Sequence, residues 1–476
     1  MFRENKTDSR LHQNITYSKK ELVGILIAAS FASFLAPFFG AALNIAIPTI
    51  SQSFAVSPNM LAMLTTTYLL SSVIFLVPAA RLADIFGLLR VFTIGLIIGV
   101  IGTLLAPFSP SIGLLLICQV IIGIGFSCVI SNAIALLSMT FPPEQRGFAI
   151  GVAVACVYLG LTAGPLLGGI LTSMFGWSSV YSFVCIICVC TILIARISVR
   201  REIILTPGEP FDWKGAILYC LVIFSLLYGL IHLSNNIGAF LVIGGCALLL
   251  LFIKIELKAE YPAFAIRLFK RNRAFTLGNI VTVINYGATY AVSFFMSLYL
   301  QVIGVLTPAE AGIVMVSLPI VQMIFSPVAG RLSDTISARV LMTAGMSVTT
   351  LGMFLLVQIG EQYNQVWVIA TLALLGLGVA FFAAPNVNLV LSSVPRKDNG
   401  SANSIHATMR QIGMVVSMAL ATSFITLSFG GTVGLYADQQ ALISAMHLTF
   451  GCGAALCFIG AVVSWFAKKE DERVIS

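Results

Sequence analysis

The stretch ARLADIFGLLRV at residues 80–91 returns as GRLSDTISARV at residues 330–340, which begins 250 residues later. A second pair agrees with the first. FPPEQRGFA at 141–149 matches SVPRKDNGSA at 393–402, with its proline and glycine displaced by 253 residues. Two independent matches at nearly one offset indicate a duplicated unit. The sequence therefore predicts two related halves that carry the same motifs at corresponding places.

The composition is typical of a polytopic membrane protein. The 476 residues are 59% hydrophobic and 9% charged, with a mean hydropathy of +1.02, a balance that a soluble globular protein does not need. All ten cysteines lie in apolar runs, which argues against a disulfide framework. Cys185 and Cys188 have no second ligand pair, so we interpret them as small buried hydrophobic residues rather than a metal or redox site.

Fourteen segments are long and apolar enough to cross a bilayer as helices. The first, from about Leu22 to Ile47, is too long for the core of a signal peptide, so we expect it to remain as a spanning helix. The narrowest separation is at Ser234-Asn235-Asn236, within 213–256. The predicted spans centre near residues 35, 70, 98, 122, 159, 187, 223, 247, 287, 320, 348, 377, 416 and 456. The predicted class is all-α.

The basic residues predict the orientation. With the N-terminus inside, 25 of the 26 lysines and arginines border cytoplasmic loops, and the exception is Arg410, inside a predicted helix. Because cytoplasmic loops retain lysine and arginine, we expect both termini in the cytoplasm and the chain in the plasma (cell) membrane. This distribution explains the net charge of +8 as membrane orientation and argues against a nucleic-acid partner.

The repeat and the span count together predict the domains. The matched motifs link span 2 to span 10 and loop 4–5 to loop 12–13, so each copy has six helices and two extra helices lie between them. The predicted parts are a cytoplasmic tail (1–21), an N-terminal six-helix bundle (22–196), cytoplasmic linkers with inserted helices 7 and 8 (197–273), a C-terminal six-helix bundle (274–467) and a cytoplasmic tail (468–476).

An ordered set of motifs carries a family resemblance. The motifs are ARLADIFGLLR, GLTAGPLLGG at 160–169, FDWKG at 211–215, APN at 384–386 and RQIG at 410–413. With these the chain resembles the major facilitator superfamily, and in particular its fourteen-helix drug–proton antiporter branch. The resemblance implies a major facilitator fold, a substrate site between two six-helix bundles, and efflux of drugs in exchange for protons.

The fifth span contains the antiporter motif of that branch. Its members here are Gly151, Gly160, Gly164, Pro165, Gly168 and Gly169. Small residues four apart let another helix approach closely, and proline bends a helix by removing a backbone hydrogen bond. In the family this helix lies between the two bundles, so the resemblance implies a hinge-like role. The alternative is close packing without any special movement.

The duplicated loop predicts a gate. Its candidate residues are Arg81, Asp84, Gly87 and Arg90 in the first copy, and Gly330, Arg331, Asp334 and Arg339 in the second. Gly87 permits a tight turn, and Asp84 could cap the next helix or pair with Arg81 or Arg90. In the family this loop helps to latch the outward-open form; the alternative is a solvated marker of topology. Ala80 and Leu88-Leu89 depart from the family pattern, which predicts a weaker first latch.

The resemblance breaks where the family usually carries its coupling charges. Phe39 stands at the usual first-helix aspartate, five residues before Asn44, while Gln119 and Ile122 replace an arginine and a glutamine in the fourth span. No acidic residue falls near mid-bilayer, and Glu310 is the closest to an outer boundary. Either other groups carry the proton or the protein is not a proton antiporter. His406 could exchange a proton, although an interfacial position at the inner end of its helix is the stronger interpretation.

Polar residues inside the predicted spans are candidates for the substrate path. Each could face a central cavity or join two helices. They are Asn44, Tyr68, Gln119, Asn132, Tyr158, Asn285, Tyr290, Gln322, Asn386, Asn388 and Arg410. Arginine keeps its proton, so Arg410 would bind an anionic group, tie its helix to a carbonyl or acid, or reach to the inner surface. An interior poor in acids favours neutral, anionic or amphipathic substrates over dicationic drugs.

The predicted function is a secondary transporter that exports small amphipathic compounds by alternating access, coupled to protons as in the family. Its partners would be the lipid bilayer, a small-molecule substrate and protons, and we expect it to act as a monomer. The rivals are a proton-independent facilitator or metabolite exporter and a non-transporting sensor or scaffold. No G-x-x-x-x-G-K-[ST] loop, nucleophile–base pair or metal cluster is evident, so we predict neither a cofactor, a metal site nor an enzyme.

Overall fold

The computed structural model describes residues 18–198, 202–233, 236–259, 264, 266–333, 335–395, 399–430 and 438–467. Over these residues it is all-α, and fourteen helical segments are long and apolar enough to cross a membrane. Each of the fourteen contains one of the predicted centres, so the span count is confirmed. The two runs within 213–256 are separate helices.

The first six spans are continuous helices with identifiable ends. They are α1 (Lys19–Phe54), α2 (Pro58–Phe86), α3 (Leu88–Leu105) with a 3₁₀ turn η1 (Ala106–Phe108), α4 (Ile112–Thr140), α5 (Pro143–Phe175) and α6 (Ser178–Ser198). Ser18 and Glu21 form a capping box at the start of α1. Gly87, at φ 116°, separates α2 from α3, a backbone conformation that glycine adopts without strain.

The remaining spans include two that are interrupted. They are α7 (Trp213–Ile231), α8 (Asn236–Glu256), the short α9 (Arg267–Arg271), α10 (Arg273–Thr289), α11 (Ala291–Val302), α12 (Pro308–Met315), α13 (Ser317–Leu332), α14 (Ala338–Leu356), α15 (Gln365–Ser392), α16 (Asn399–Phe429) and α17 (Gln439–Trp465). The ninth span is α10 with α11, and the tenth is α12 with α13. Both interruptions are single residues, Tyr290 and Val316.

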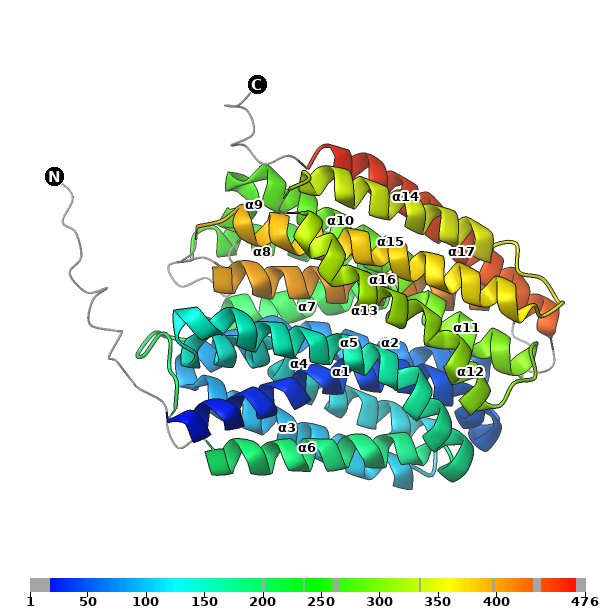
Figure 1. The fold of residues 1–476 in the computed structure, drawn as a ribbon, viewed down its shortest axis with the longest axis horizontal. Helices are drawn as coiled ribbons and strands as arrows, with labels where there is room; N and C mark the ends of the chain where they lie inside the picture. Colours follow the sequence, from blue (N-terminus) through cyan, green and yellow to red (C-terminus); the bar gives the residue numbers. More distant parts are fainter. Residues whose placement is uncertain are drawn as a thin grey trace.

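The helices pack in two groups that lie one above the other in Figure 1. Helices α1–α6 contact one another in one group, and α10–α17 do so in the other. The start of α1 and the end of α17 lie at the same end of the molecule, at the left of Figure 1. We call this the terminal end and the opposite one the far end. Apart from Arg410, the lysines and arginines of the described helices and loops belong to the terminal end.

The inserted helices α7 and α8 pack against each other, and α7 also contacts α2 and α16. The hydroxyl of Tyr219 donates to the carbonyl of Val73 in α2 at 3.0 Å, and the Cys220 thiol donates to the carbonyl of Ile74 at 3.6 Å. These contacts fix α7 along the edge where the two groups meet. Most of α8 instead presents apolar side chains outward, as expected for a lipid-facing helix.

Candidate functional site

The two groups of helices are joined closely at the far end, where α5 meets α12. A Cβ placed on Gly169 would overlap the carbonyl of Pro308, and one on Gly312 would overlap the carbonyl of Pro165. The two backbones therefore touch without intervening side chains, an approach that only small residues permit. The backbone amide of Ala309 also donates to the Ser173 hydroxyl at 3.2 Å.

Polar contacts extend this junction to α1, α2, α11 and α16. Ser297 of α11 donates to the carbonyl of Asn44 at 2.6 Å, and Gln301 donates to that of Ile45 at 3.1 Å. Both residues also hydrogen-bond to each other at 3.1 Å. Further contacts between the groups join Thr426 to Asn59 at 3.2 Å and Gln411 to Ser72 at 3.3 Å. These bonds lie in the far half or near the middle of their helices.

The terminal half of α5 is different. From residue 145 to residue 157 it makes no hydrogen bond to α10–α17 within the described part of the chain. Gly147 and Gly151 have open space where a side chain would be, and the Phe148 side chain is 70% exposed. On α13, Ile324 and Val328 are exposed as well. Among the described residues, 145–157 of α5 therefore lack the backbone contact with the opposite group that closes the far end.

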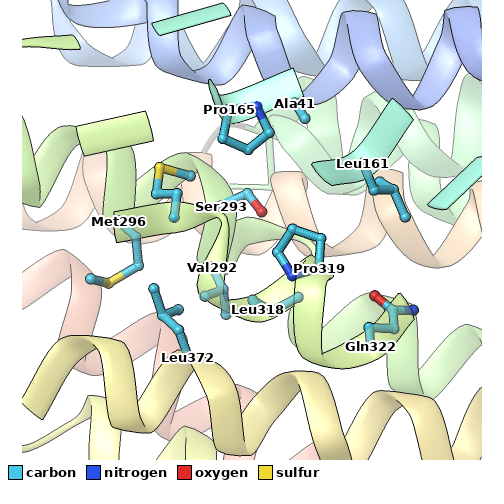
Figure 2. Close-up of a pocket in the computed structure, with 11 residues that line it drawn as sticks. Ala41, Leu161, Pro165, Val292, Ser293, Met296, Leu318, Pro319, Gln322 and Leu372 are labelled. Atoms are coloured by element: carbon cyan, nitrogen blue, oxygen red, sulfur yellow. The ribbon is translucent and has the colours of Figure 1, made fainter. Parts of the chain in front are cut away.

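A cavity of about 60 Å³ lies between the groups, directly beneath the far-end junction. Its lining comes from both groups: Ala41, Leu161, Pro165, Val292, Ser293, Met296, Met315, Leu318, Pro319, Gln322 and Leu372. Figure 2 shows Leu161 and Pro165 facing Pro319 and Gln322 across it. The walls are mainly apolar, with the amide of Gln322 and the hydroxyl of Ser293 as polar groups, which is the usual character of a small-molecule site.

Polar side chains gather one helical turn nearer the terminal end. Tyr158 precedes Leu161 on α5, and Ser326 follows Gln322 on α13. The Tyr158 hydroxyl lies beside that of Ser326 and within electrostatic reach of Tyr286 and Arg410. The Ser326 Oγ itself is buried and has no hydrogen-bond partner among the described residues. His406 interacts electrostatically with Arg410, one turn away on α16. We call Tyr158, Tyr286, Ser326, His406 and Arg410 the polar floor.

Arg410 has no partner among the described residues. It makes no ion pair or hydrogen bond to them, and its Nε is buried without an acceptor. Within the described part of the chain, Arg410 therefore forms neither the ion pair with an acid nor the hydrogen bond to a carbonyl that were considered from the sequence. A cationic side chain in this position is costly in a membrane interior, which makes Arg410 a candidate functional residue.

The glycine motif of α5 serves two interfaces. A Cβ on Gly160 would approach the carbonyl of Phe34 to 2.6 Å, one on Gly164 the Cβ of Ala41 to 2.5 Å, and one on Gly168 the Cβ of Ala42 to 2.6 Å. This stripe packs on α1, within its own group of helices. Only the motif's Pro165 and Gly169 contact α12 of the other group. Gly151 touches neither.

The first gating loop is held by the linker that follows α6. Arg81 forms an ion pair with Glu209 at 2.7 Å, and their side chains are 12% and 32% exposed. The Glu202 carboxylate accepts hydrogen bonds from the backbone amides of Leu89 at 2.8 Å and Arg90 at 3.3 Å. The Glu202 side chain occupies the space where Gly87 lacks a Cβ. The carbonyl of Asp84 accepts from the linker amides of Leu205 and Thr206, both at 3.0 Å.

This geometry corrects one prediction. The start of α3 is capped by Glu202, not by Asp84, and Arg81 pairs with Glu209 rather than with Asp84. The linker brings both carboxylates to the loop from more than 100 residues away, a contact that local sequence does not specify. Arg90 contributes its backbone amide, and its side chain is exposed.

The second gating loop is organised differently. The Arg339 guanidinium lies over the ring of Trp465 in α17, 5.3 Å from its centroid. Asn388 of α15 donates to the Ser333 hydroxyl at 2.7 Å. Gly330 comes near Ala384, and Arg331 is exposed. Asp334 lies outside the described residues.

Aromatic rings fill the place of the missing acid. Phe39 is fully buried, and its ring packs edge-to-face against Tyr68, Phe126 and Tyr181, with centroids 5.1, 5.9 and 5.6 Å away. Gln119 donates to the Tyr181 hydroxyl at 2.8 Å. Ile122 is also fully buried. Rings and an amide have thus replaced the carboxylate and arginine of the family pattern.

Most of the other path candidates join helices within one group. Asn44 accepts a hydrogen bond from Thr65 of α2, whereas Asn132 donates to the carbonyl of Cys128 within its own helix. Asn285 donates to the sulfur of Met346, and Asn386 donates to Thr282. Tyr290 instead lies at the interface between the groups, where its hydroxyl is close to Gly40 of α1. The structure therefore brings Tyr158, Tyr290, Gln322 and Arg410 to the interface between the groups, and Gln322 is the candidate that lines the cavity.

Several residues of the interface were not anticipated from the sequence. Ser297 and Gln301 are the far-end donors, and Ser326 and Tyr286 belong to the polar floor. Ser297 and Gln301 are four apart in an apolar helix, a spacing that places them on one face. That spacing was a usable signal, although it does not identify the partner helix.

The chain is similar over most of its length to membrane transporters of one family. The Major Facilitator Superfamily profile matches residues 29–305 and 278–475. The riboflavin transporter RibZ of Clostridioides difficile (strain 630) is 28% identical over 452 residues, which are 95% of this chain and 99% of that protein. The multidrug resistance protein Stp of Mycobacterium tuberculosis (strain CDC 1551 / Oshkosh) is 28% identical over 418 residues, covering 86% and 76%.

Solved structures share the fold. A peptide transporter POT in complex with sulfate has a TM-score of 0.71 at 13% identity, covering 94% of this chain and 96% of that one. A bacterial homolog of the human lysosomal transporter Spinster, in an inward-facing and unoccupied conformation, has a TM-score of 0.66 at 17% identity, covering 94% and 97%. At these identities the likeness concerns the fold alone.

Proposed function

The chain belongs to the Major Facilitator Superfamily, and from this premise we propose that it exports small amphipathic compounds by alternating access. It is a multi-pass membrane transporter and not an enzyme. The proposal adds a direction, a class of substrate and a mechanism. In it, the N-terminal (22–196) and C-terminal (274–467) bundles rock about the cavity between them.

One observation carries the mechanism, and it is the asymmetry of the interface. Backbone packing of α5 on α12 closes the far end, while residues 145–157 of α5 make no hydrogen bond to α13 among the described residues. A carrier that alternates needs a seal at one end at a time. A scaffold has no need of two gating loops or of an unsealed cavity.

The basic residues support the direction. They gather at the terminal end, which assigns this end to the cytoplasm under the positive-inside rule. The conformation is then open toward the cytoplasm and closed toward the outside. In the cell membrane an exporter collects its substrate in this state and releases it after the far end opens. We propose that a single chain suffices, since both bundles belong to it.

The cavity and the relatives support the substrate class. Its walls are mainly apolar with a few polar groups, which suits amphipathic molecules. Among similar proteins, one is named a riboflavin transporter, others multidrug resistance proteins, and SmvA of Salmonella typhimurium (strain LT2) a methyl viologen resistance protein. The cavity of about 60 Å³ is smaller than the roughly 300–1,000 Å³ of a ligand pocket, so loading requires α5 and α13 to separate further.

Proton-independent transport is a second candidate, and a specific observation favours it. Phe39 and its ring cluster occupy the place of the coupling acid. The described carboxylates of the spans, Asp84 and Glu310 among them, lie at helix ends. Coupling, which the family resemblance predicts, would therefore use a group other than a mid-span carboxylate.

Flux in proteoliposomes tests the proposal. The purified chain is reconstituted, and efflux of riboflavin and of a dansylated neutral amide is followed with and without an imposed pH gradient. Transport above protein-free liposomes supports the carrier. Acceleration by the gradient supports antiport, and gradient-independent flux selects the second candidate. Cavity access that stays permanently at one face, measured by cysteine labelling, would contradict alternating access.

A further inference from the structure

The polar floor lies beside an apolar cavity and contains a cation without a counter-charge. Among the described residues, Arg410 has no acid within ion-pairing distance, and its Nε has no acceptor. The hydroxyl of Tyr158 and the ring of His406 lie within electrostatic reach of it, and Ser326 Oγ is buried without a hydrogen-bond partner among the described residues. The side of the site nearer the terminal end is thus positive and rich in unused donors.

Arg410 in one half of the chain corresponds in position to Tyr158 in the other half. Arg410 and Tyr158 are 252 residues apart, within the 250–253 offset of the repeat, so they occupy corresponding turns of α5 and α16. Helix α5 belongs to one bundle and α16 to the other. A ligand that touches both residues would therefore bind the two bundles together at the level where they must rock.

The apolar cavity continues this site toward the far end. Leu161 and Pro165 follow Tyr158 on α5, and Pro319 and Gln322 precede Ser326 on α13. One helical turn rises about 5.4 Å along the axis. The polar floor therefore lies about one turn from the cavity wall, a distance similar to the length of a small aromatic ring. Figure 2 shows the wall formed by these four cavity residues.

We infer that this chamber binds monoanionic amphipathic molecules, with a carboxylate-type group on Arg410, Tyr158 and Ser326 and an apolar or aromatic body in the cavity. The inference rests on the proposed transport function and names its substrate class. A planar guanidinium pairs with a carboxylate through two parallel hydrogen bonds. Tyr158 and Ser326 each have a hydroxyl that can donate to it. Because Arg410 Nε and Ser326 Oγ are buried, such a pair is stronger here than in bulk water.

The absence of an acid explains the selectivity. The family pattern has a carboxylate in the first helix, a counter-charge for a cation, and here Phe39 stands in its place. A cationic ligand near Arg410 would meet repulsion without a compensating charge among the described residues. The chamber therefore discriminates by sign of charge, since its apolar wall alone would accept molecules of either sign.

Binding of three probes with one body tests this directly. Dansylglycine is an anion, dansylglycinamide is neutral and dansylcadaverine is a cation, and dansyl fluorescence rises in apolar sites. In phosphatidylcholine nanodiscs the full-length chain should bind dansylglycine roughly tenfold more tightly than dansylglycinamide, and dansylcadaverine most weakly. Equal affinity for the three probes, or a preference for the cation, would overturn the inference.

Substitutions locate the effect. Arg410→Gln should remove the preference for dansylglycine and leave dansylglycinamide within about twofold. Arg410→Lys should keep part of it, because the charge remains and the planar fork is lost. Arg339→Gln is the matched control, since Arg339 stacks on Trp465 outside the chamber, and it should keep the full preference for dansylglycine.

If Arg410→Gln does not fold, Arg410→Lys and Tyr158→Phe replace it in the test. Each should weaken the binding of dansylglycine several-fold while the affinity for dansylglycinamide is unchanged. Unchanged discrimination in both would overturn the inference.

The test separates this inference from the proposed function. If the wild type carries dansylglycinamide across proteoliposomes but does not favour the anion, the charge selectivity is wrong and the transporter stands. If it binds dansylglycine through Arg410 but carries none of the probes, the site stands and transport of this substrate class is wrong.

Discussion

The two ends of the interface between the bundles are built on different physical principles. At the far end, backbone meets backbone at Gly169 and Gly312, and Ser297 and Gln301 add hydrogen bonds. At the terminal end, the first gating loop is engaged by the linker through Glu202 and makes no hydrogen bond to the opposite bundle among the described residues. A seal of small residues can close tightly and still separate, because it has few interlocking side chains.

The largest effect is expected from Gly164→Leu, which attacks the packing behind the seal. Its Cβ would lie 2.5 Å from that of Ala41 in α1. Overpacking of this kind costs about 1–3 kcal/mol or more, so flux should be abolished and the melting temperature lowered, with the protein still inserted. Flux and thermal unfolding of the purified variant measure both. Undiminished flux would defeat any role of the glycine stripe in movement.

Gly169→Val should act on the seal itself. The added side chain would overlap the backbone of Pro308 in the other bundle, so it opposes closure of the far end rather than folding of either bundle. A penalty of about 1–3 kcal/mol corresponds to a population shift of roughly 5- to 150-fold. We expect flux to fall about tenfold or more, with a melting temperature near that of the wild type.

Gly151→Val is the matched control on the same helix. Open space surrounds Gly151 at the terminal end, so flux should stay within about twofold of the wild type, as for an exposed substitution. If Gly151→Val and Gly169→Val were equally damaging, the difference between the two ends would be refuted.

The double variant Ser297→Ala with Gln301→Ala should have an intermediate effect. It removes two hydrogen bonds to α1 carbonyls, each worth about 0.6 kcal/mol on average in a membrane protein. Far-end labelling by a membrane-impermeant thiol reagent, at a cysteine placed at Ala309, should therefore speed up several-fold. Labelling at the wild-type rate would show that these bonds do not stabilise the closed end.

The smallest effect concerns the linker clamp. Arg81→Gln or Glu209→Gln breaks the partly buried ion pair, whose contribution is about 1 kcal/mol or less. Because a partly exposed ion pair contributes little to stability, its loss should change flux only about two- to threefold. The exchanged pair Arg81→Glu with Glu209→Arg should restore wild-type flux. Additive losses in the exchanged pair would argue against a direct interaction.

Features encoded locally were predictable from the sequence. A span is an apolar run of sufficient length, so all fourteen were found, even α7 and α8 across their short separation. The offset between Gly330 and Ala80 gave the two halves. The spacing of Gly160, Gly164 and Gly168 predicted close helix packing, and α1 is the helix they pack on.

Features that depend on helix rotation and on distant partners were not predictable. The sequence offered Asp84 as a cap for α3, but Glu202 arrives through the linker and takes that role. Of the polar candidates, Asn285 and Asn386 turned inward to their own bundle, while Tyr158 and Arg410 reached the interface. An amide in an apolar helix has the same local signal in either case, and only tertiary packing distinguishes them.

We propose that one end of the interface opens when the other closes. Distance measurements between spin labels test this alternation. In a functional variant without the ten native cysteines, one label pair at Ser173 and Ala309 reports the far end, and another at Phe148 and Val328 reports the terminal end. On adding a transported compound, the far-end pair should gain a longer distance and the terminal pair a shorter one. If both distances stayed unchanged, or if both became longer, the alternation of the two ends would be refuted.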